Sequence, residues 1–191
     1  MESTKLMPGG SAQQGQRLDA LVPALRDLLC DDAVSTDVGA REQASVDGAP
    51  MSPILAAQLP LGLADAVVYA KDPDTVPEII SLAVSHGVPV TPRGKGTGNY
   101  GQAIPLHGGL VLDMSRAGKI LDIGDGYITA EAGATMIALE RAARKTGQQL
   151  WMYPSTTGSS IGGFLAGGSG GTGSIAHGSN DSGFVVGLDV V

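Results

Sequence analysis

The sequence TPRGKGTGNYGQ, residues 91–102, places four glycines within twelve residues, directly after a short apolar run. Glycine has no Cβ and adopts positive φ readily, so several backbone N–H groups of such a loop can converge on one anion. Because the chain carries 12 Lys and Arg against 19 Asp and Glu, a net charge of −7, local geometry has to hold any anionic ligand. The stretch therefore predicts a phosphate-binding loop.

The sequence of this loop offers three other interpretations. Gly96 to Gly101 matches the dinucleotide fingerprint G-x-G-x-x-G, but that fingerprint needs a helix that begins among the glycines, and Pro105 opposes one. A nucleotide P-loop would need a glycine where Pro89 stands. A purely structural glycine loop stays open beside phosphate binding.

The segment upstream of the loop has the pattern of a strand, a helix and a second strand. Strands are expected over 66–69 and 88–91, and a helix over 74–85, with Asp74 as its N-cap and Gly87 at its C-terminal end. The two strands should be parallel because a helix connects them. The apolar stripe of the helix comprises Val76, Ile79, Ile80 and Ala83.

The N-terminal third begins with a polar stretch, residues 1–15, which is expected to be a disordered leader. An amphipathic helix is expected over 17–29, followed by an irregular connection over 31–63 that three prolines interrupt. Cys30 is the single cysteine, which excludes an internal disulfide and favours a reducing compartment. Its side chain is expected in the core.

Three strands at short spacing are expected downstream of the loop, over 110–114, 119–123 and 127–131, with antiparallel pairing. The turn Gly124-Asp125-Gly126 reads as a hairpin between the last two. A helix should follow, capped by Thr135 and closed by Gly147. Its expected apolar residues are Ile137, Ala138, Leu139 and Ala142.

A second glycine-rich stretch, PSTTGSSIGGFLAGGSGGTGSIAHG at 154–178, is expected to wrap a ligand. The alternative is a flexible Gly/Ser linker, which would not need the apolar residues that interrupt the stretch. These are Ile161, Phe164, Leu165 and Ile175. The final run, FVVGLDVV at 184–191, is expected to be a buried strand, and the chain is expected to be cut at this point.

The order of these motifs resembles one family. An R-G-x-G-T loop after a strand, a proline followed by S-x-I-G-G, and a glycine before an apolar run are similar to the FAD-binding half of the vanillyl-alcohol oxidase and p-cresol methylhydroxylase superfamily. The resemblance extends over 66–191, about two thirds of the chain, and is strongest for branches that oxidise 2-hydroxy acids such as lactate or glycolate.

The resemblance implies an α+β fold with two lobes and FAD extended between them. A small βαβ lobe would reach from residue 16 to about 114, and a mainly antiparallel lobe with helices would begin at about 115. Together, 16–191 would form an FAD-binding domain truncated at its C-terminus, with the substrate-binding cap domain absent.

The resemblance also implies which residues contact FAD. Those around the pyrophosphate would be Arg93, Gly94, Lys95, Gly96, Thr97, Gly98 and Asn99. Those along the flavin and ribityl side would be Pro154, Thr157, Gly158, Ser160, Ile161, Gly162 and Gly163. Gly178 would precede the last strand, and Val185 and Val186 would contact adenine or ribose.

Some positions admit a second role or depart from the family. Arg93 is equally suited to a structural ion pair with Asp113, and Lys95 to a solvated loop cation. Family members that tether flavin through the first loop use a histidine where Thr97 and Gly98 stand, so FAD is expected to be bound non-covalently. The stretch 166–183 carries more glycines than the family pattern, with His177 where an aromatic residue often precedes Gly178.

The expected function is a FAD-dependent oxidoreductase that acts on a small-molecule 2-hydroxy acid or related alcohol, with no catalytic base identifiable. The alternatives are a non-catalytic FAD-binding subunit of a larger redox complex and a nicotinamide-dependent flavin reductase. His86, His107 and His177 show no metal-ligand spacing, so no metal is expected. The net charge opposes binding to nucleic acid, and no apolar run of membrane-spanning length occurs, so a cytoplasmic protein with an unidentified electron acceptor is expected.

Overall fold

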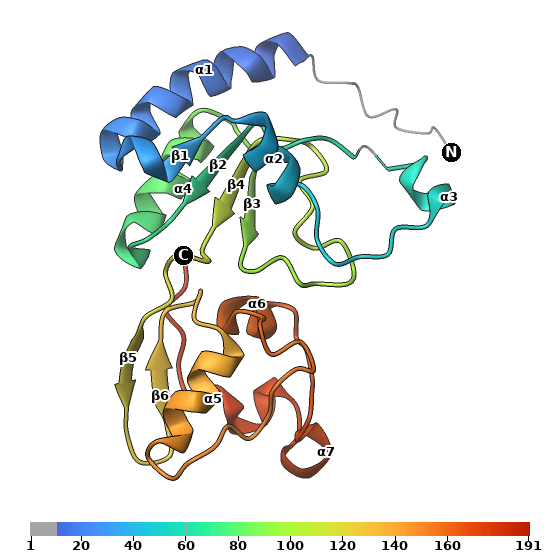
Figure 1. Ribbon diagram of the computed structural model, residues 1–191. Helices are drawn as coiled ribbons and strands as arrows, with labels where there is room; N and C mark the ends of the chain where they lie inside the picture. The colour runs from blue at the N-terminus through green and yellow to red at the C-terminus, as the bar shows by residue number, and fades with distance from the viewer. Residues whose placement is uncertain (1–10, 60) are drawn as a thin grey trace, which may run out of the picture.

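The computed structural model describes residues 11–59 and 61–191, which form two lobes (Figure 1). One lobe is built on a four-stranded sheet with helices on both faces, and the other on a two-stranded hairpin with short helices beside it. The predicted α+β class with two lobes is confirmed.

The four-stranded sheet has the order β1-β2-β4-β3. Its strands are β1 (Val34–Ser35), β2 (Ala66–Tyr69), β3 (Val90–Arg93) and β4 (Leu110–Asp113). Strands β2 and β3 each pair in parallel with β4, whereas β1 pairs antiparallel with β2. The predicted strand over 88–91 therefore exists, but it begins and ends two residues later.

The antiparallel pairing predicted for 110–114 is wrong, because β4 is an interior strand of this sheet and pairs in parallel with both neighbours, β2 and β3. All of its residues are buried, and such a strand is covered on both faces, as parallel strands in mixed folds are. The connection over 94–109 carries the chain from the end of β3 back to the start of β4. The glycine loop is thus the crossover that makes the parallel pairing possible.

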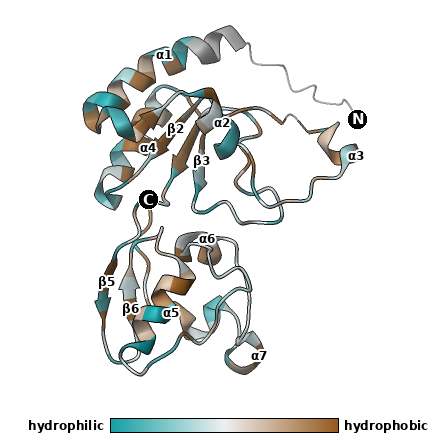
Figure 2. Cartoon of the chain, viewed as in Figure 1, coloured by the Kyte–Doolittle hydropathy of each residue, from teal (hydrophilic) through white to brown (hydrophobic). Residues whose placement is uncertain are grey.

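Helices α1 (Ser11–Leu28) and α4 (Val76–Ser85) cover one face of the sheet, and α2 (Val38–Ala44) lies on the other (Figure 1). Hydrophobic residues follow the strands between these helices (Figure 2). The core under α1 and α4 includes Leu21, Leu25, Ile79, Val68, Leu110 and Leu112. Helix α1 begins at Ser11, earlier than predicted, and Pro23 lies inside it; residues 1–10 of the predicted leader lie outside the described residues.

The connection over 31–63 is more regular than predicted. Besides β1, it contains the turn η1 (Asp31–Ala33) and helices α2 and α3 (Pro53–Ala56). Asp37 caps α2 by accepting from the amide of Ala40, and Ser52 caps α3 in the same way from Leu55. These elements were missed because a two-residue strand and helices of one or two turns are too short to show periodicity.

The N-cap predicted for α4 is also wrong. Asp72, not Asp74, supplies the capping carboxylate, and it accepts from the amide of Asp74 at the start of a 3-10 turn, η2 (Pro73–Thr75). Helix α4 begins at Val76 directly after this turn, and its N-cap is Thr75, whose side chain makes no capping hydrogen bond. Gly87 has φ of +63°, which agrees with its predicted place at the end of the helix.

The second lobe begins with the predicted hairpin. Strands β5 (Ile120–Ile123) and β6 (Ile128–Ala130) pair antiparallel, and Gly126 in the turn has φ of +81°. Helix α5 (Met136–Arg144) follows, with Thr135 as its cap, as predicted. Its buried side differs from the predicted stripe by a rotation about the axis, so that only Leu139 is common to both; the buried residues are Met136, Leu139 and Ala143.

The glycine-rich stretch 154–178 is folded rather than a linker. It contains α6 (Ile161–Ala166) and α7 (Ser174–His177), and a π-helical turn, η3 (Asn180–Phe184), follows. Phe164 is buried in a cluster with Met152 and Leu139 of the second lobe. Ile175, in contrast, is fully exposed and does not add to this core.

The buried strand predicted at the end of the chain is not present. Residues 185–191 form no strand, and Val186, Leu188, Val190 and Val191 are exposed. A strand is buried when a neighbour pairs with it, and among the described residues β5 and β6 pair only with each other. The prediction of a strand rested on apolar composition alone, and composition does not show whether a neighbouring strand is there to pair with it.

Cys30 is exposed, not in the core as predicted. Its Sγ donates to Oδ1 of Asp32 at 2.7 Å, and Nζ of Lys71 donates to the other carboxylate oxygen at 2.7 Å. These two hydrogen bonds lower the pKa of Asp32 to about 2, and the bond to the carboxylate raises the pKa of the Cys30 thiol. The thiol therefore stays protonated at neutral pH and has little nucleophilic character.

The core between α1, α4 and the sheet provides a test of this packing. Ile79 is fully buried, whereas Val84 on the same helix is 69% exposed. We predict that Ile79→Ala lowers the free energy of unfolding by about 2–5 kcal/mol because it leaves a cavity. The control Val84→Ala should change it by no more than about 0.5 kcal/mol. Urea unfolding followed by circular dichroism measures both, and equal effects would contradict the described burial.

Candidate functional site

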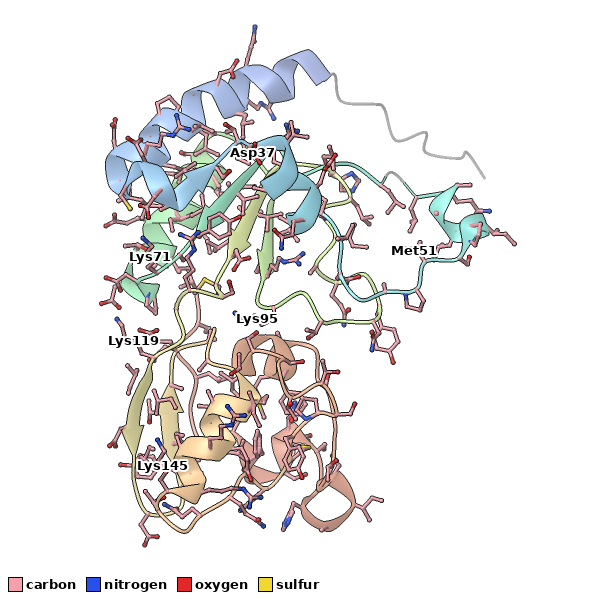
Figure 3. All side chains as sticks on the ribbon, in the orientation of Figure 1. Asp37, Met51, Lys71, Lys95, Lys119 and Lys145 are labelled. Carbon is pink, nitrogen blue, oxygen red and sulfur yellow. The ribbon has the colours of Figure 1, made fainter. Side chains whose placement is uncertain are left out.

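The two glycine-rich stretches meet where the lobes face each other. The hydroxyl groups of Thr97 and Ser159 are 2.7 Å apart, within hydrogen-bond distance. A Cβ added to Gly94 would overlap Oγ of Ser160, so the backbone of the loop lies directly against this serine. Lys95 is at the end of β3, on the side that faces α6 (Figure 3). Residues more than sixty positions apart are thus brought into one site.

The first wall of the site is the backbone of residues 94–99. Their amide N–H groups donate to no acceptor among the described residues, and the next amide, that of Tyr100, donates to Oε1 of Gln102 at 3.2 Å. Gly96 has φ of +63°, which turns the chain within the loop. Several donors without partners in a partly buried loop are the arrangement that binds an anion.

The second wall contains a hydroxyl group without a partner. Ser160 is 2% exposed, and its Oγ makes no hydrogen bond among the described residues. Ser160 is the N-cap of α6, but its side chain makes no capping bond. A buried polar atom left unpaired costs free energy, so this hydroxyl is available for a polar group held between the two walls.

The residues after Ser160 hold it in place. The amides of Ile161 and Gly162 donate to the carbonyls of Ala134 and Ala132, each at 2.8 Å. A Cβ on Gly162 would lie 2.8 Å from the Cβ of Ala132, which is too close, so glycine is needed at this position for packing. The S-x-I-G-G motif therefore anchors Ser159 and Ser160 to the chain that leads into α5.

Arg93 makes contacts that the sequence did not indicate. Its Nη1 donates to the carbonyls of Ala44 at 3.0 Å and Val46 at 2.6 Å. The carboxylate of Asp113, on the neighbouring strand, accepts instead from the amide of Ser115 at 2.7 Å. The guanidinium group is therefore engaged with the segment after α2, and not with Asp113.

Two cationic side chains nevertheless lie at this edge of the sheet. Arg93 and Lys95 line a cavity of about 260 Å³ with Asp113 and Tyr69, at the carboxyl ends of the parallel strands. Ligands of open α/β sheets bind in such a position. The described residues contain no group of three or more His, Cys, Asp or Glu side chains placed to hold a metal ion.

The remaining predicted site residues are less closely tied to the loop. Thr157 accepts from the amide of Ile137 through its carbonyl at 2.9 Å, and Gly158 is exposed beside it. Pro154 is half-buried near Gly171. Their roles toward a ligand stay predictions.

Gly178 and Val185 lie after α7 and form no described contact with residues 94–99. Gly178 has φ of +86° and ψ of −164°, a conformation that glycine alone adopts readily. Its backbone therefore requires glycine whether or not it contacts a ligand. Its role toward a ligand, and that of Val185, stay predictions as well.

Two parts of the site were missed. Ser159, which bonds to Thr97, was not predicted, although it belongs to the same motif as the predicted residue Ser160. The segment over 44–49 was not predicted at all. Its only local signal is the Asp47-Gly48 pair, which is typical of a turn.

The fold and these two walls define a two-lobed domain that binds a phosphate-bearing cofactor. Residues 64–191 match the FAD binding domain family, and the chain belongs to this family. FAD is the cofactor of the family, as predicted.

The chain is similar to two curated relatives. It is 31% identical over 153 residues to an uncharacterized FAD-linked oxidoreductase of Mycobacterium tuberculosis, covering 79% of this chain and 30% of the relative. It is 32% identical over 130 residues to glycolate oxidase subunit GlcD of Bacillus subtilis, covering 66% of this chain and 27% of that protein. The chain thus spans less than a third of the length of these relatives.

The fold is also found in a solved structure of the predicted superfamily. The structure of p-cresol methylhydroxylase with substrate bound matches with a TM-score of 0.60 and 20% identity, over 76% of this chain and 28% of that one. The resemblance predicted from the motifs is confirmed.

The described residues fit a cofactor that contains a pyrophosphate. The loop provides unpaired amide donors, Ser160 provides an unpaired buried hydroxyl, and Lys95 provides an exposed cation at the mouth of the loop. Gly94 leaves the loop without a side chain where the two walls approach each other. The buried hydroxyl of Ser160 is the feature that is costly without a ligand, and a bound phosphate would satisfy it.

The two adjacent serines provide a matched test. Because Oγ of Ser160 is unpaired, we predict that Ser160→Ala leaves the free energy of unfolding of the ligand-free chain unchanged or raises it by up to about 1 kcal/mol. Ser159→Ala removes the bond to Thr97 and should lower it by about 1–3 kcal/mol. Chemical unfolding without FAD measures both, and a loss of stability in Ser160→Ala would show that its hydroxyl has a partner.

Proposed function

We propose that this chain is the FAD-binding portion of an FAD-dependent oxidoreductase that oxidises a 2-hydroxy acid or a related alcohol. The observation that carries the proposal is that the amides over 94–99 and the buried hydroxyl of Ser160, which lies against this loop at Gly94, have no hydrogen-bond partner among the described residues. The names of the relatives, an FAD-linked oxidoreductase and a glycolate oxidase subunit, support the reaction type and the class of substrate.

In this proposal the loop holds the pyrophosphate through its backbone. The residues concerned are Arg93, Gly94, Lys95, Gly96, Thr97, Gly98 and Asn99. The amides donate to phosphate oxygens, Lys95 adds a positive charge, and Ser160 donates its hydroxyl proton from the opposite wall. The bond between Thr97 and Ser159 joins the loop to the second wall beside this position.

The stretch after α5 lines the flavin and ribityl side. The residues concerned are Pro154, Thr157, Gly158, Ser160, Ile161, Gly162 and Gly163, with Gly178 and Val185 toward the adenosine end. When bound, FAD supplies the redox chemistry by accepting a hydride, and the chain supplies its position and electrostatic environment. No residue of this chain is assigned as the catalytic base.

The rival function is a non-catalytic FAD-binding subunit of a larger complex. An absorbance experiment separates the two. The purified protein should be yellow, and its flavin band should bleach anaerobically with a 2-hydroxy acid such as glycolate or lactate. Bleaching by a reduced nicotinamide alone would indicate a flavin reductase, and no bleaching by either would favour the non-catalytic subunit.

The place of the protein in the cell is a further part of the proposal. No helix among the described residues has both the length and the apolar character needed to cross a bilayer. A single cysteine without a disulfide partner supports a reducing compartment, and we place the protein in the cytoplasm.

FAD should be bound non-covalently, because Thr97 and Gly98 occupy the positions where a tethering histidine would stand. Acid precipitation of the FAD-loaded protein is expected to leave the yellow colour in the supernatant. Flavin that stays bonded to the pellet after washing would contradict the role given to this loop.

The shape of the loop provides a second test. A Cβ at Gly96 would overlap the guanidinium group of Arg93, whereas Gly126 in the β5–β6 turn has open space around it. Both have positive φ, so Gly96→Ala and Gly126→Ala introduce similar backbone strain.

We predict that Gly96→Ala reduces the affinity for FAD about tenfold or more, and that Gly126→Ala leaves the affinity unchanged. Quenching of flavin fluorescence on titration with protein measures the two dissociation constants. Equal affinities in the two variants would rule out the phosphate-binding role of the loop.

A further inference from the structure

The glycine loop packs against a segment of the first lobe that precedes the residues matched by the family. We define the clasp as residues 44–49, the last residue of α2 and the chain that follows it. The clasp lies outside 64–191, the part of the chain that matches the FAD binding domain family. Its contacts with the loop involve backbone atoms and the side chains of Arg93, Asn99 and Asp47.

Arg93 joins the clasp to the loop. From the end of β3 it donates through Nη1 to two carbonyls of the clasp, those of Ala44 at 3.0 Å and Val46 at 2.6 Å. The rest of its guanidinium group lies against Gly96, where an added Cβ would overlap it. One side chain therefore fixes the clasp and supports the turn of the loop at the same time.

A turn in the clasp packs directly against the loop. Oδ1 of Asp47 accepts from the amide of Ala49 at 2.9 Å and closes this turn. A Cβ on Gly48, at its tip, would lie 3.0 Å from the carbonyl oxygen of Gly98 and 3.3 Å from that of Thr97. Glycine at position 48 allows the two backbones to approach this closely.

The loop needs such support because it is rich in glycine. Glycine loses more conformational freedom on ordering than any other residue, so a loop with three glycines in five residues would not hold its amides in one direction unaided. A ligand that finds its donors already oriented does not have to offset this entropy on binding.

We propose that the clasp is part of the cofactor site. Arg93 acts as a positioning residue: it holds the clasp against the loop and so orients the loop amides. The proposal rests on the proposed function for the identity of the cofactor. The clasp, which lies outside the FAD-binding family match, then sets the affinity for the pyrophosphate indirectly, by orienting the loop that binds it.

The first test needs no cofactor. Gly48→Ala should shift the ¹H–¹⁵N resonances of the amides over 94–99 in the ligand-free chain, because the new methyl group displaces the loop carbonyls. Gly62→Ala is the matched control, since a Cβ there would lie 3.7 Å from its nearest neighbour, an ordinary contact. Loop resonances that are equally unmoved in both variants would overturn the proposal, whether or not the chain binds FAD.

Arg93→Lys separates positioning from a direct phosphate contact. Lysine keeps the positive charge of Arg93 but has no planar guanidinium group. It therefore cannot bond the carbonyls of Ala44 and Val46 and also lie against Gly96. If Arg93 positions the loop, Arg93→Lys shifts the same amide resonances in the ligand-free chain as Gly48→Ala does. If Arg93 is only a phosphate ligand, the ligand-free resonances stay in place, and the proposal is wrong.

The second test uses FAD. Gly48→Ala should weaken FAD binding about tenfold and move the ³¹P resonances of the bound pyrophosphate, while Gly62→Ala changes neither. A variant that is merely less stable would bind less FAD with unchanged ³¹P positions, and that result would overturn the proposal. A wild-type chain that binds no FAD would overturn the proposed function instead, and the ligand-free amide shifts would still decide whether the clasp orients the loop.

Discussion

The close approach between Gly94 and Ser160 is the constraint on which the site depends. Any side chain at position 94 would occupy the space of the serine hydroxyl, so the two walls can face each other only because glycine follows β3. The hydrogen bond between Thr97 and Ser159 forms beside this contact. Together these two contacts bring a loop of each lobe to one place, where backbone donors and a buried hydroxyl have no partner among the described residues.

The rest of the fold serves to hold these two walls. Strand β3 leads into the loop because β4 pairs with it in parallel, so the chain over 94–109 has to cross back to the start of β4. On the other side, the amides of Ile161 and Gly162 bind the carbonyls before α5 and fix Ser160. An acidic chain with a net charge of −7 can hold an anionic cofactor in this way because the donors are local and oriented.

The sequence predicted the parts of this arrangement that depend on local chemistry. The loop at 94–99, the cap at Thr135 and the hairpin turn at Gly126 follow from what glycine and threonine do to the nearby backbone. It did not predict properties set by distant residues. The parallel place of β4 depends on what covers both its faces, and the contacts of Arg93 depend on a carbonyl 49 positions away. The strand predicted for the apolar run at 184–191 failed for the same reason, because a strand forms only where a distant segment pairs with it.

The central claim is that FAD binds between these two walls. Titration of the ¹⁵N-labelled chain with FAD, followed by ¹H–¹⁵N correlation spectra, tests it most directly. The account predicts that the largest shifts occur at the amides of Gly94 to Asn99 and at Ser159 to Gly163. Binding that leaves both stretches unchanged while amides elsewhere shift, for example in α1 or the β5–β6 hairpin, would contradict it.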